Sequence, residues 1–512
     1  MSSRELVRQL ISFKEGRPVP RYSTIHVYRM SNPLIVAFLR QAGESRPWGI
    51  AFGRAEDEHP QILCVPDGRN RDLVAEMCKE FAEYMFDYFR VEGEVFNPIT
   101  KENAQPESLP QVWLPGDKHV EMFHFLEYAF WKQRKNDDRK SLLSTLARLS
   151  GWIYRESTLK GQQVVIDAAK TFQDSYVFPT DNSGLGHLGA CLEWFGDGTL
   201  QSKRISARNA GFVHVSPSVD TQLDDDVFEP LLSRRLTLIR ENKNTKQIEA
   251  QIEEALTPEL ERRWRLTQQA HSFLLQDERP DNSGVIDLVA DTLQSYCGNF
   301  QRIERNLADD TLGPAFTRHP ETDFHGSAAA SHYFVANAAE SQYMSVLVHE
   351  DSELQMELLR KGDAYYATVL KVWDEGSGRK TIPVWKLRTE VIENLRLRDG
   401  ERYSPLGSRK HAIQVREIDV KESKIREFEA EWITNKTVPL MNPIDASLTS
   451  EKWVGKTLMF VPSDSSDLDF MSSQAVWTAK SGPGAWLTHG TPPLPVDSEV
   501  VDDVTQLEEK PL

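Results

Sequence analysis

Alternating apolar and polar positions are densest between residues 364 and 420. Residues 364–373 are rich in tyrosine, valine, threonine and tryptophan, which suit a pleated and half-buried surface. A glycine-containing turn at 374–378 follows, and residues 381–387 resume the pattern, so the two runs predict a β-hairpin. Further short strands are expected at 403–406 and 412–420. Short strands joined by glycine turns, with no long helix between them, predict a small closed or nearly closed barrel.

A second pattern, in residues 1–92, predicts an α/β unit. A short amphipathic helix over 5–13 should precede four strands, at 24–29, 34–39, 48–52 and 62–65. Residues 71–91 carry apolar side chains at i, i+3 and i+4 spacing, which predicts a long helix. The segment 93–117 contains four spaced prolines and is expected to be a linker.

Helical spacing dominates residues 118–361. The pattern predicts a mixed helical and α+β domain over 118–232, with helices at 118–131 and 138–155 and short strands at 164–168 and 176–178. Residues 233–361 are expected to be a helical region. Two of its helices, over 246–256 and 258–275, should meet at Thr257 and Pro258, because threonine is a common N-cap and proline suits the first helical turn.

The C-terminal part is predicted to hold the barrel module and two further segments. A short helix over 425–433 should end the module, which then spans 362–433. Residues 434–490 form a mixed segment with a strand at 457–461. Residues 491–512 are acidic and contain prolines, so they should stay disordered in isolation. The whole pattern predicts an α+β fold in several domains.

Composition sets limits on this picture. The chain has 512 residues and a formal net charge of −17. Its four cysteines are widely spaced and form no CxxC pair, so the sequence predicts neither a disulfide framework nor a zinc knuckle. The N-terminal segment is charged where a signal peptide is apolar, and no apolar run approaches the length of a membrane span. We therefore expect a cytoplasmic protein without membrane contact.

Local charge suggests a function for the barrel. Residues 360–410 contain twelve Lys and Arg against seven Asp and Glu, in a chain that is acidic overall. Basic side chains neutralise phosphates, and aromatic rings beside them stack on bases. The candidate nucleic-acid-binding residues are Arg379, Lys380, Arg396, Arg398, Arg409 and Lys410, with Trp373 and Trp385 as stacking platforms. The alternative is that these charges cover the solvent face of a barrel whose core contains the tryptophans.

The stretch LRLRDGERYSPLGSRKHAIQVREID, at 395–419, resembles small OB-like β-barrel modules of prokaryotic helicase and ATPase proteins that process nucleic acid. The resemblance covers residues 362–420 and rests on the order of strands and turns. It implies contact with DNA or RNA, or with a helicase or nuclease partner, in a bacterial or phage-related assembly such as a defence system. It implies no motor, because Ser450 stands where a phosphate-binding loop ending in Gly455-Lys456-Thr457 needs glycine.

Other groups of residues carry chemistry but complete no motif. Residues 184–189 match GxGxxG without a clear preceding strand or a following acid. His119 and His124 are five residues apart and cannot share a helix face as zinc ligands do. Two groups remain open as sites of metal binding or acid–base chemistry, namely the triplet Asp224, Asp225 and Asp226, and the cluster of His319, Asp323 and His325.

These observations favour a non-catalytic, nucleic-acid-binding component of a larger assembly, with no cofactor, catalytic residue or metal ligand assigned. Two alternatives stay open. One is a metal-dependent nuclease or hydrolase, whose site would assemble from the distant histidines and aspartates just named. The other is a protein-binding scaffold that uses the helical middle and the acidic tail.

Overall fold

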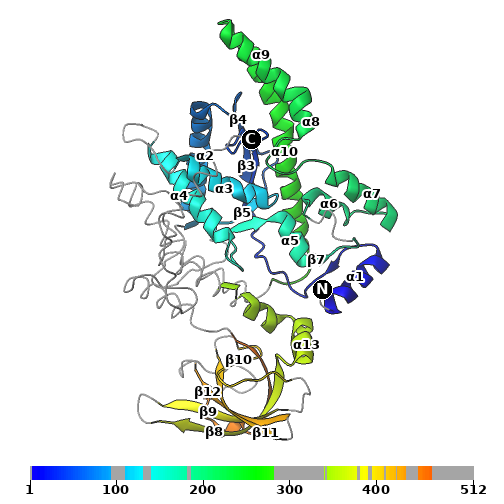
Figure 1. The fold of residues 1–512 in the computed structure, drawn as a ribbon, viewed down its shortest axis with the longest axis vertical. Coiled ribbons are helices and arrows are strands. Elements are labelled where there is room, and N and C mark those ends of the chain that lie inside the picture. The colour runs from blue at the N-terminus through cyan, green and yellow to red at the C-terminus, as the bar shows by residue number, and fades with distance from the viewer. Residues whose placement is uncertain are drawn as a thin grey trace, which may run out of the picture.

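The computed structural model of the chain describes residues 3–93, 110–130, 140–180, 186–281, 339–340, 343–376, 381–389, 395–408, 411–421, 424–433 and 448–463. The fold is α+β and multidomain, as the sequence predicts. An N-terminal part combines a sheet with helices, and a closed barrel follows toward the C-terminus (Figure 1). Among the described helices, none has both the length and the apolar character that crossing a membrane requires.

The N-terminal sheet has five strands in the order β4-β3-β2-β5-β6. Strands β2 (Leu34–Leu39), β3 (Gly49–Arg54) and β4 (Gln61–Cys64) are antiparallel neighbours. Strands β5 (Val112–Leu114) and β6 (Val165–Asp167) extend the sheet parallel to β2. All six residues of β2 are buried, because helices cover both faces of the sheet, and its sequence is accordingly apolar throughout.

The two faces of this sheet carry different helices. Phe38 packs edge-on against Phe81 of α2 (Arg71–Gly93) and against Phe123 of α3 (Asp117–Phe130). On the opposite face lies α10 (Lys246–Leu275), which contacts β2, β3, β4 and β5. The remaining N-terminal helices are α1 (Ser3–Glu15), α4 (Lys140–Ser157), α5 (Ala168–Ser175), α6 (Leu188–Glu193), α7 (Leu200–Gly211), α8 (Thr221–Leu223) and α9 (Glu229–Arg240).

One long helix, α10, replaces the two helices expected around Thr257 and Pro258. The Thr257 hydroxyl donates to Glu253 O at 2.9 Å and caps nothing, and Pro258 lies inside the helix. The apolar stripe continues in phase across the proline, with Leu256 and Leu260 both fully buried. Packing of this stripe on the sheet therefore outweighs the hydrogen bond that the proline removes.

Two further N-terminal predictions were wrong. Residues 24–29 form no strand, and in this segment only Ile25 makes a bridge, to Asp281. Inside the expected linker 93–117, residues 112–114 are the buried strand β5. Three residues after a proline-rich run give too short a pattern to predict a strand. The two-stranded pair of β1 (Val19–Pro20) and β7 (Tyr176–Val177) lies apart from the main sheet.

The barrel closes with six antiparallel strands in the order β10-β11-β12-β9-β8-β13, which is compatible with an OB-like barrel. The hairpin predicted from the sequence is β8 (Tyr365–Glu375) and β9 (Ile382–Thr389). Strands β10 (Arg402–Pro405) and β11 (Ile413–Lys421) follow. The helix α13 (Ser352–Lys361) leads into β8 and ends at Gly362, whose φ of +79° favours glycine.

The expected helix over 425–433 is instead the strand β12 (Lys424–Trp432), which pairs with β11 and β9. Phe428, Ala430 and Trp432 are buried, and Glu429 and Glu431 alternate with them, so the period is two and not 3.6. The predicted strand near 457–461 is β13 (Thr457–Pro462). It closes the barrel between β8 and β10, and so joins the barrel although it lies beyond residue 433.

Candidate anion-binding site

A cavity of about 510 Å³ opens at one end of the barrel. It lies between the end of α13, the segment 395–401 and the start of β10. Three arginines, two carboxylates and one tyrosine give it its chemistry: Arg396, Arg398, Arg402, Asp363, Glu401 and Tyr403. We call this group of six residues the mouth pocket.

Local backbone bonds hold the mouth pocket in shape. The Arg396 N–H donates to Gly362 O at 2.9 Å, which attaches the arginine-bearing segment to the end of α13. Gly400 turns the chain with a φ of +82°, and its N–H donates to Val415 O at 2.8 Å. A side chain is strained at that φ, so the glycine of the Asp-Gly pair is required here. Arg396, Arg398 and Arg402 thus project from a fixed turn.

The positive charges in the mouth pocket outnumber the negative ones. Arg396 lies 3.7 Å from Asp363, and the arginine side chain is 66% exposed. Neither Arg398 nor Arg402 has a side-chain ion pair with any residue that the structure describes. Guanidinium groups that are weakly paired and solvent-accessible are suited to bidentate binding of an oxyanion such as phosphate.

Tyr403 and Glu401 form the polar floor of the pocket. The Tyr403 hydroxyl donates to Glu401 at 2.9 Å. Burial, followed by the hydrogen bond to Glu401 and the charge of that carboxylate, raises the pKa of Tyr403 above its ordinary value. The phenol therefore stays protonated at neutral pH and remains a donor.

Three basic residues on the barrel strands differ from those of the mouth pocket, because acids pair with them closely. Lys386 and Arg388 on β9 both pair with Glu427 on β12, at 3.4 and 2.9 Å. Arg416 on β11 pairs with Glu375 at 2.6 Å and also with Glu431. Arg416 correspondingly lowers the pKa of Glu375. The mouth pocket differs from these pairs in bringing three arginines together, of which only Arg396 has a carboxylate partner among the described residues.

The sequence-predicted basic residues divide into two groups. Arg396 and Arg398 come together in the mouth pocket. Four others lie outside the described residues, namely Arg379, Lys380, Arg409 and Lys410. Arg402 was missed, although its position two residues after the Asp-Gly turn, at the start of a strand, is a signal that could have placed it beside the other two arginines.

The two tryptophans do not line the pocket. Trp385 is fully buried, its indole N–H donates to Leu448 O at 2.6 Å, and its ring packs against Trp432 and Trp453. It therefore belongs to the barrel core, where no base can reach it. Trp373 is half-buried near the end of β8, and its indole N–H donates to Glu375 at 3.1 Å.

The other sequence candidates form no site within the described segments. His319, Asp323 and His325 lie outside them. Asp224, Asp225 and Asp226 lie in one π-helical turn, and no group of three His, Cys, Asp or Glu among the described residues could hold a metal ion. Residues 184 and 185 of the GxGxxG match also lie outside the described residues.

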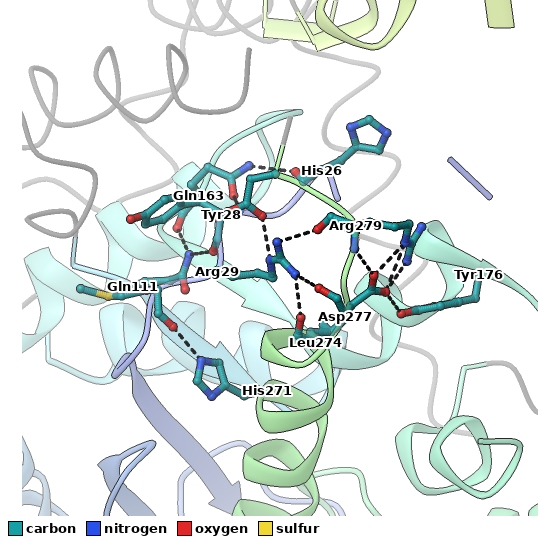
Figure 2. A network of polar contacts seen from close by, with 12 residues as sticks. His26, Tyr28, Arg29, Gln111, Gln163, Tyr176, His271, Leu274, Asp277 and Arg279 are labelled. Carbon is teal, nitrogen blue, oxygen red and sulfur yellow. Dashed lines mark hydrogen bonds and ion pairs between the residues drawn. The ribbon is translucent and has the colours of Figure 1, made fainter. Parts of the chain in front are cut away.

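A second polar centre fixes the end of α10 (Figure 2). Arg29 donates to the backbone oxygens of Leu274, Asp277 and Arg279 and pairs with Asp281 at 2.8 Å. Asp277 in turn accepts from Arg279 and from the hydroxyl of Tyr176. Because the donors and acceptors of this network satisfy one another, we interpret it as a structural network that holds the end of α10 in place.

A second cavity, of about 430 Å³, lies beside β6 and includes His26, Asp117, Asp167 and Lys170. Burial raises the pKa of Asp167 to about 6 and lowers that of His26 to about 4. The Asp167 side chain caps α5 by accepting the Lys170 N–H at 2.9 Å. Lys170 itself pairs with Asp174, and acids outnumber lysines in the lining, so this cavity lacks the excess of positive charge found in the mouth pocket.

Comparison of the chain with protein-family models, with curated proteins and with solved structures finds no match.

Proposed function

We propose that the chain is a non-catalytic nucleic-acid-binding protein that holds the phosphate backbone of DNA or RNA at the mouth pocket. The observation that carries this proposal is the gathering of Arg396, Arg398 and Arg402 around one cavity. Other cations of the barrel strands are paired with acids, as Arg388 is with Glu427. The proposal therefore places phosphate contact at this end of the barrel.

Guanidinium groups bind phosphate oxygens through two parallel N–H donors. Such contacts read the backbone and not the base sequence. The chain is otherwise acidic, with a formal net charge of −17, so nucleic acid is repelled from most of its surface. Focal contact at the mouth pocket agrees with that distribution.

Two other functions from the sequence remain as alternatives with less support. A metal-dependent nuclease or hydrolase would need converging ligands, and the described residues contain no such group. A protein-binding scaffold, or docking to a helicase or nuclease partner, would use exposed surfaces irrespective of the charge of the mouth pocket. Bacterial or phage-related defence is the setting that the sequence resemblance suggests for any of these activities.

The test is fluorescence anisotropy with labelled single-stranded and duplex DNA and RNA at two salt concentrations. The variant Arg398→Ala/Arg402→Ala removes two weakly paired arginines from the pocket. The control Lys386→Ala/Arg388→Ala removes two cations that both pair with Glu427. We expect the pocket variant to lose most of the binding and to lower the slope of log affinity against log salt by about 1.5 to 2.

The control should retain at least half of the wild-type affinity. An equal loss in the two variants would show that general charge, and not the mouth pocket, governs binding. Binding without salt dependence would contradict phosphate contact altogether. Circular dichroism of both variants verifies that the barrel stays folded.

A further inference from the structure

The helix α7 is exposed over most of its length, as α9 and α13 also are. It is described over its whole length, and of its 12 residues only Ala207 is buried. From residue 198 to 219 the sequence contains Lys203, Arg204 and Arg208 and no Asp or Glu. A stretch of 22 residues without an acid is notable in a chain with 77 of them. The helix is thus both prominent and positively charged.

The outward face of α7 is defined by the helical period. At 100° per residue, the side opposite Ala207 presents six exposed residues, which we call the outward face: Gln201, Ser202, Ile205, Ser206, Arg208 and Asn209. Five of the six carry hydrogen-bonding groups, and Ile205 is the one apolar member. Arg204 lies at the border of this face and is also exposed.

The helix is held firmly from beneath by α6. A Cβ placed on Gly189 would lie 3.8 Å from the Cβ of Ala210, so the two helices approach closely through small residues. His187 accepts the Ala190 N–H at Nδ1, at 3.2 Å, and its Nε2 donates to Val213 O at 2.6 Å. This imidazole therefore links the start of α6 to the chain just beyond α7.

The start of α7 is also fixed. The Thr199 side chain accepts the Ser202 N–H at 3.2 Å and caps the helix. The first residue of α7 also lies beside the end of α1, since a Cβ on Gly16 would be 3.4 Å from the Cβ of Leu200. Figure 1 shows α7 at the outer edge of the N-terminal part, next to α6. The helix is thus fixed in place, with its polar side facing solvent.

Two kinds of macromolecular surface attract an exposed cationic helix, namely an anionic membrane and a nucleic acid. A membrane-bound helix buries a broad apolar face in the lipid, whereas the outward face of α7 offers Ile205 and, at its C-cap, the exposed Phe212 among five polar side chains. Amide, hydroxyl and guanidinium groups are instead the side chains that bind base edges and phosphates. The composition of the outward face therefore favours nucleic acid.

The dimensions favour duplex DNA. A helix with its side chains is about 10–12 Å across, which matches the major groove of B-DNA at about 12 Å. The major groove of duplex RNA is too deep and narrow for such a helix. The order of a short helix, a connection and a projecting second helix is that of helix-turn-helix proteins, whose second helix enters the groove, although the connection 194–199 is longer here.

We infer that α7 is a second nucleic-acid contact, which enters the major groove of duplex DNA with its outward face. Gln201, Arg208 and Asn209 would face base edges, and Lys203 and Arg204 would contact the flanking phosphates. The inference extends the proposed function by assigning duplex DNA as a ligand. The inference rests on the proposed function in one respect, namely that the protein binds nucleic acid. The two contacts can be tested separately, because α7 and the mouth pocket share no residue.

The test compares two pairs of helix arginines in the full chain. Arg204→Ala/Arg208→Ala alters α7, and Arg234→Ala/Arg240→Ala is the matched control on the exposed surface of α9. The probe is a fluorescein-labelled DNA duplex with a randomised centre, and a single strand of the same length serves for comparison. We expect the α7 pair to weaken duplex binding by about tenfold or more and the control pair by less than about twofold. Single-strand binding should change little in either.

A second variant separates base reading from charge. Gln201→Ala/Asn209→Ala keeps every cation, so it should bind randomised duplex with nearly wild-type affinity. Repeated selection from the randomised pool should enrich a sequence motif with the wild-type protein and a weaker motif with this variant. If neither protein enriches a motif, α7 does not read bases in the groove and the inference is wrong.

The remaining outcomes also decide the matter. Equal weakening by the α7 pair and the α9 pair would reduce the effect to general charge and overturn the inference. Loss of binding to phosphatidylserine vesicles, with duplex binding unchanged in the α7 pair, would assign the helix to a membrane. If Arg398→Ala/Arg402→Ala abolishes single-strand binding and the α7 pair leaves duplex binding intact, the mouth-pocket proposal stands and the α7 inference falls. If the α7 pair abolishes duplex binding and Arg398→Ala/Arg402→Ala leaves single-strand binding intact, the α7 inference stands and the mouth-pocket proposal falls.

Discussion

The hydroxyl of Tyr403 donates a 2.9 Å hydrogen bond to Oε2 of Glu401, and the same oxygen accepts the backbone N–H of Arg398 at 3.1 Å. Two donors therefore fix one carboxylate oxygen at the floor of the mouth pocket. Because burial raises the pKa of Tyr403, its proton remains available for this bond at neutral pH. Glu401 thus offsets part of the positive charge that the three arginines bring together.

Glu401→Gln should strengthen the binding of single-stranded oligonucleotides. The substitution removes one negative charge and keeps an oxygen that can accept from Tyr403, so we expect about three- to tenfold tighter binding at low salt. The gain should shrink as salt is added. Glu417→Gln, at an exposed position on β11, is the control, and an equal gain there would show that only net charge matters.

Gly49→Ala should destabilise the N-terminal part. A Cβ on Gly49 would lie 2.6 Å from Leu260 Cδ1 and 3.2 Å from Leu63 O, so the fully buried Leu260 side chain of α10 would have to move within the core. We expect the free energy of unfolding to fall by about 1–3 kcal/mol, as overpacking usually costs. Gly116→Ala is the control, because nothing lies within 4 Å of a Cβ there. Urea unfolding measures both, and similar values would contradict the close approach of α10.

Pro258→Ala should stabilise the same part of the chain. Pro258 is exposed inside α10 and cannot donate the hydrogen bond that a helical residue makes four positions back. Alanine restores that donor, so we expect a gain of up to about 3 kcal/mol and a higher melting temperature. Thr245→Ala, outside the helix interior and without a side-chain cap bond, should change little. A loss of stability in Pro258→Ala would show that the packing of α10 depends on a proline-induced bend.

Long, strongly patterned elements were predictable from the sequence. The apolar run of β2 and the alternation in β8 and β9 each carry their own signal. Strand β5 did not, because three residues show no period and its burial depends on the parallel partners β2 and β6. Strand β12 was misread because its acidic positions also fit a short solvent-facing helix, and only pairing with β9 and β11 decides between the two.

The candidate site was predictable in part, for a related reason. Arg396 and Arg398 both lie just before the Asp399-Gly400 turn, which the sequence shows directly, so their proximity could be predicted. The neutralisation of Arg388 by Glu427 depends on register between strands that are distant in the chain. The burial of Trp385 likewise depends on which face of β9 points inward. Exposed charge and core aromatics look alike in a sequence until that register is known.

His119 provides a prediction about pH. The sequence raised it as a metal-ligand candidate, but the structure buries it, with Nδ1 accepting the Phe38 N–H at 3.1 Å and Nε2 donating to Val215 O at 2.8 Å. Burial lowers its pKa to about 3. Between its ordinary pKa of about 6.5 and that value, the unfolded chain binds a proton that the folded chain refuses. Stability should therefore fall as pH drops through this range and be unaffected by this group above it.

The change from pH 7 to pH 4 should cost about 3 kcal/mol at this residue, from the difference between the two pKa values. His119→Asn removes the titration, so it should be less stable than the wild type near neutral pH and approach it in acid. Glu156, whose pKa burial raises to about 7, contributes with the opposite sign, because its stabilisation is lost as pH rises from its ordinary range. Comparing the variant with the wild type at each pH cancels that contribution. His59→Asn, at a 65% exposed side chain, is the control, and a parallel pH dependence in His119→Asn and the wild type would contradict the assignment.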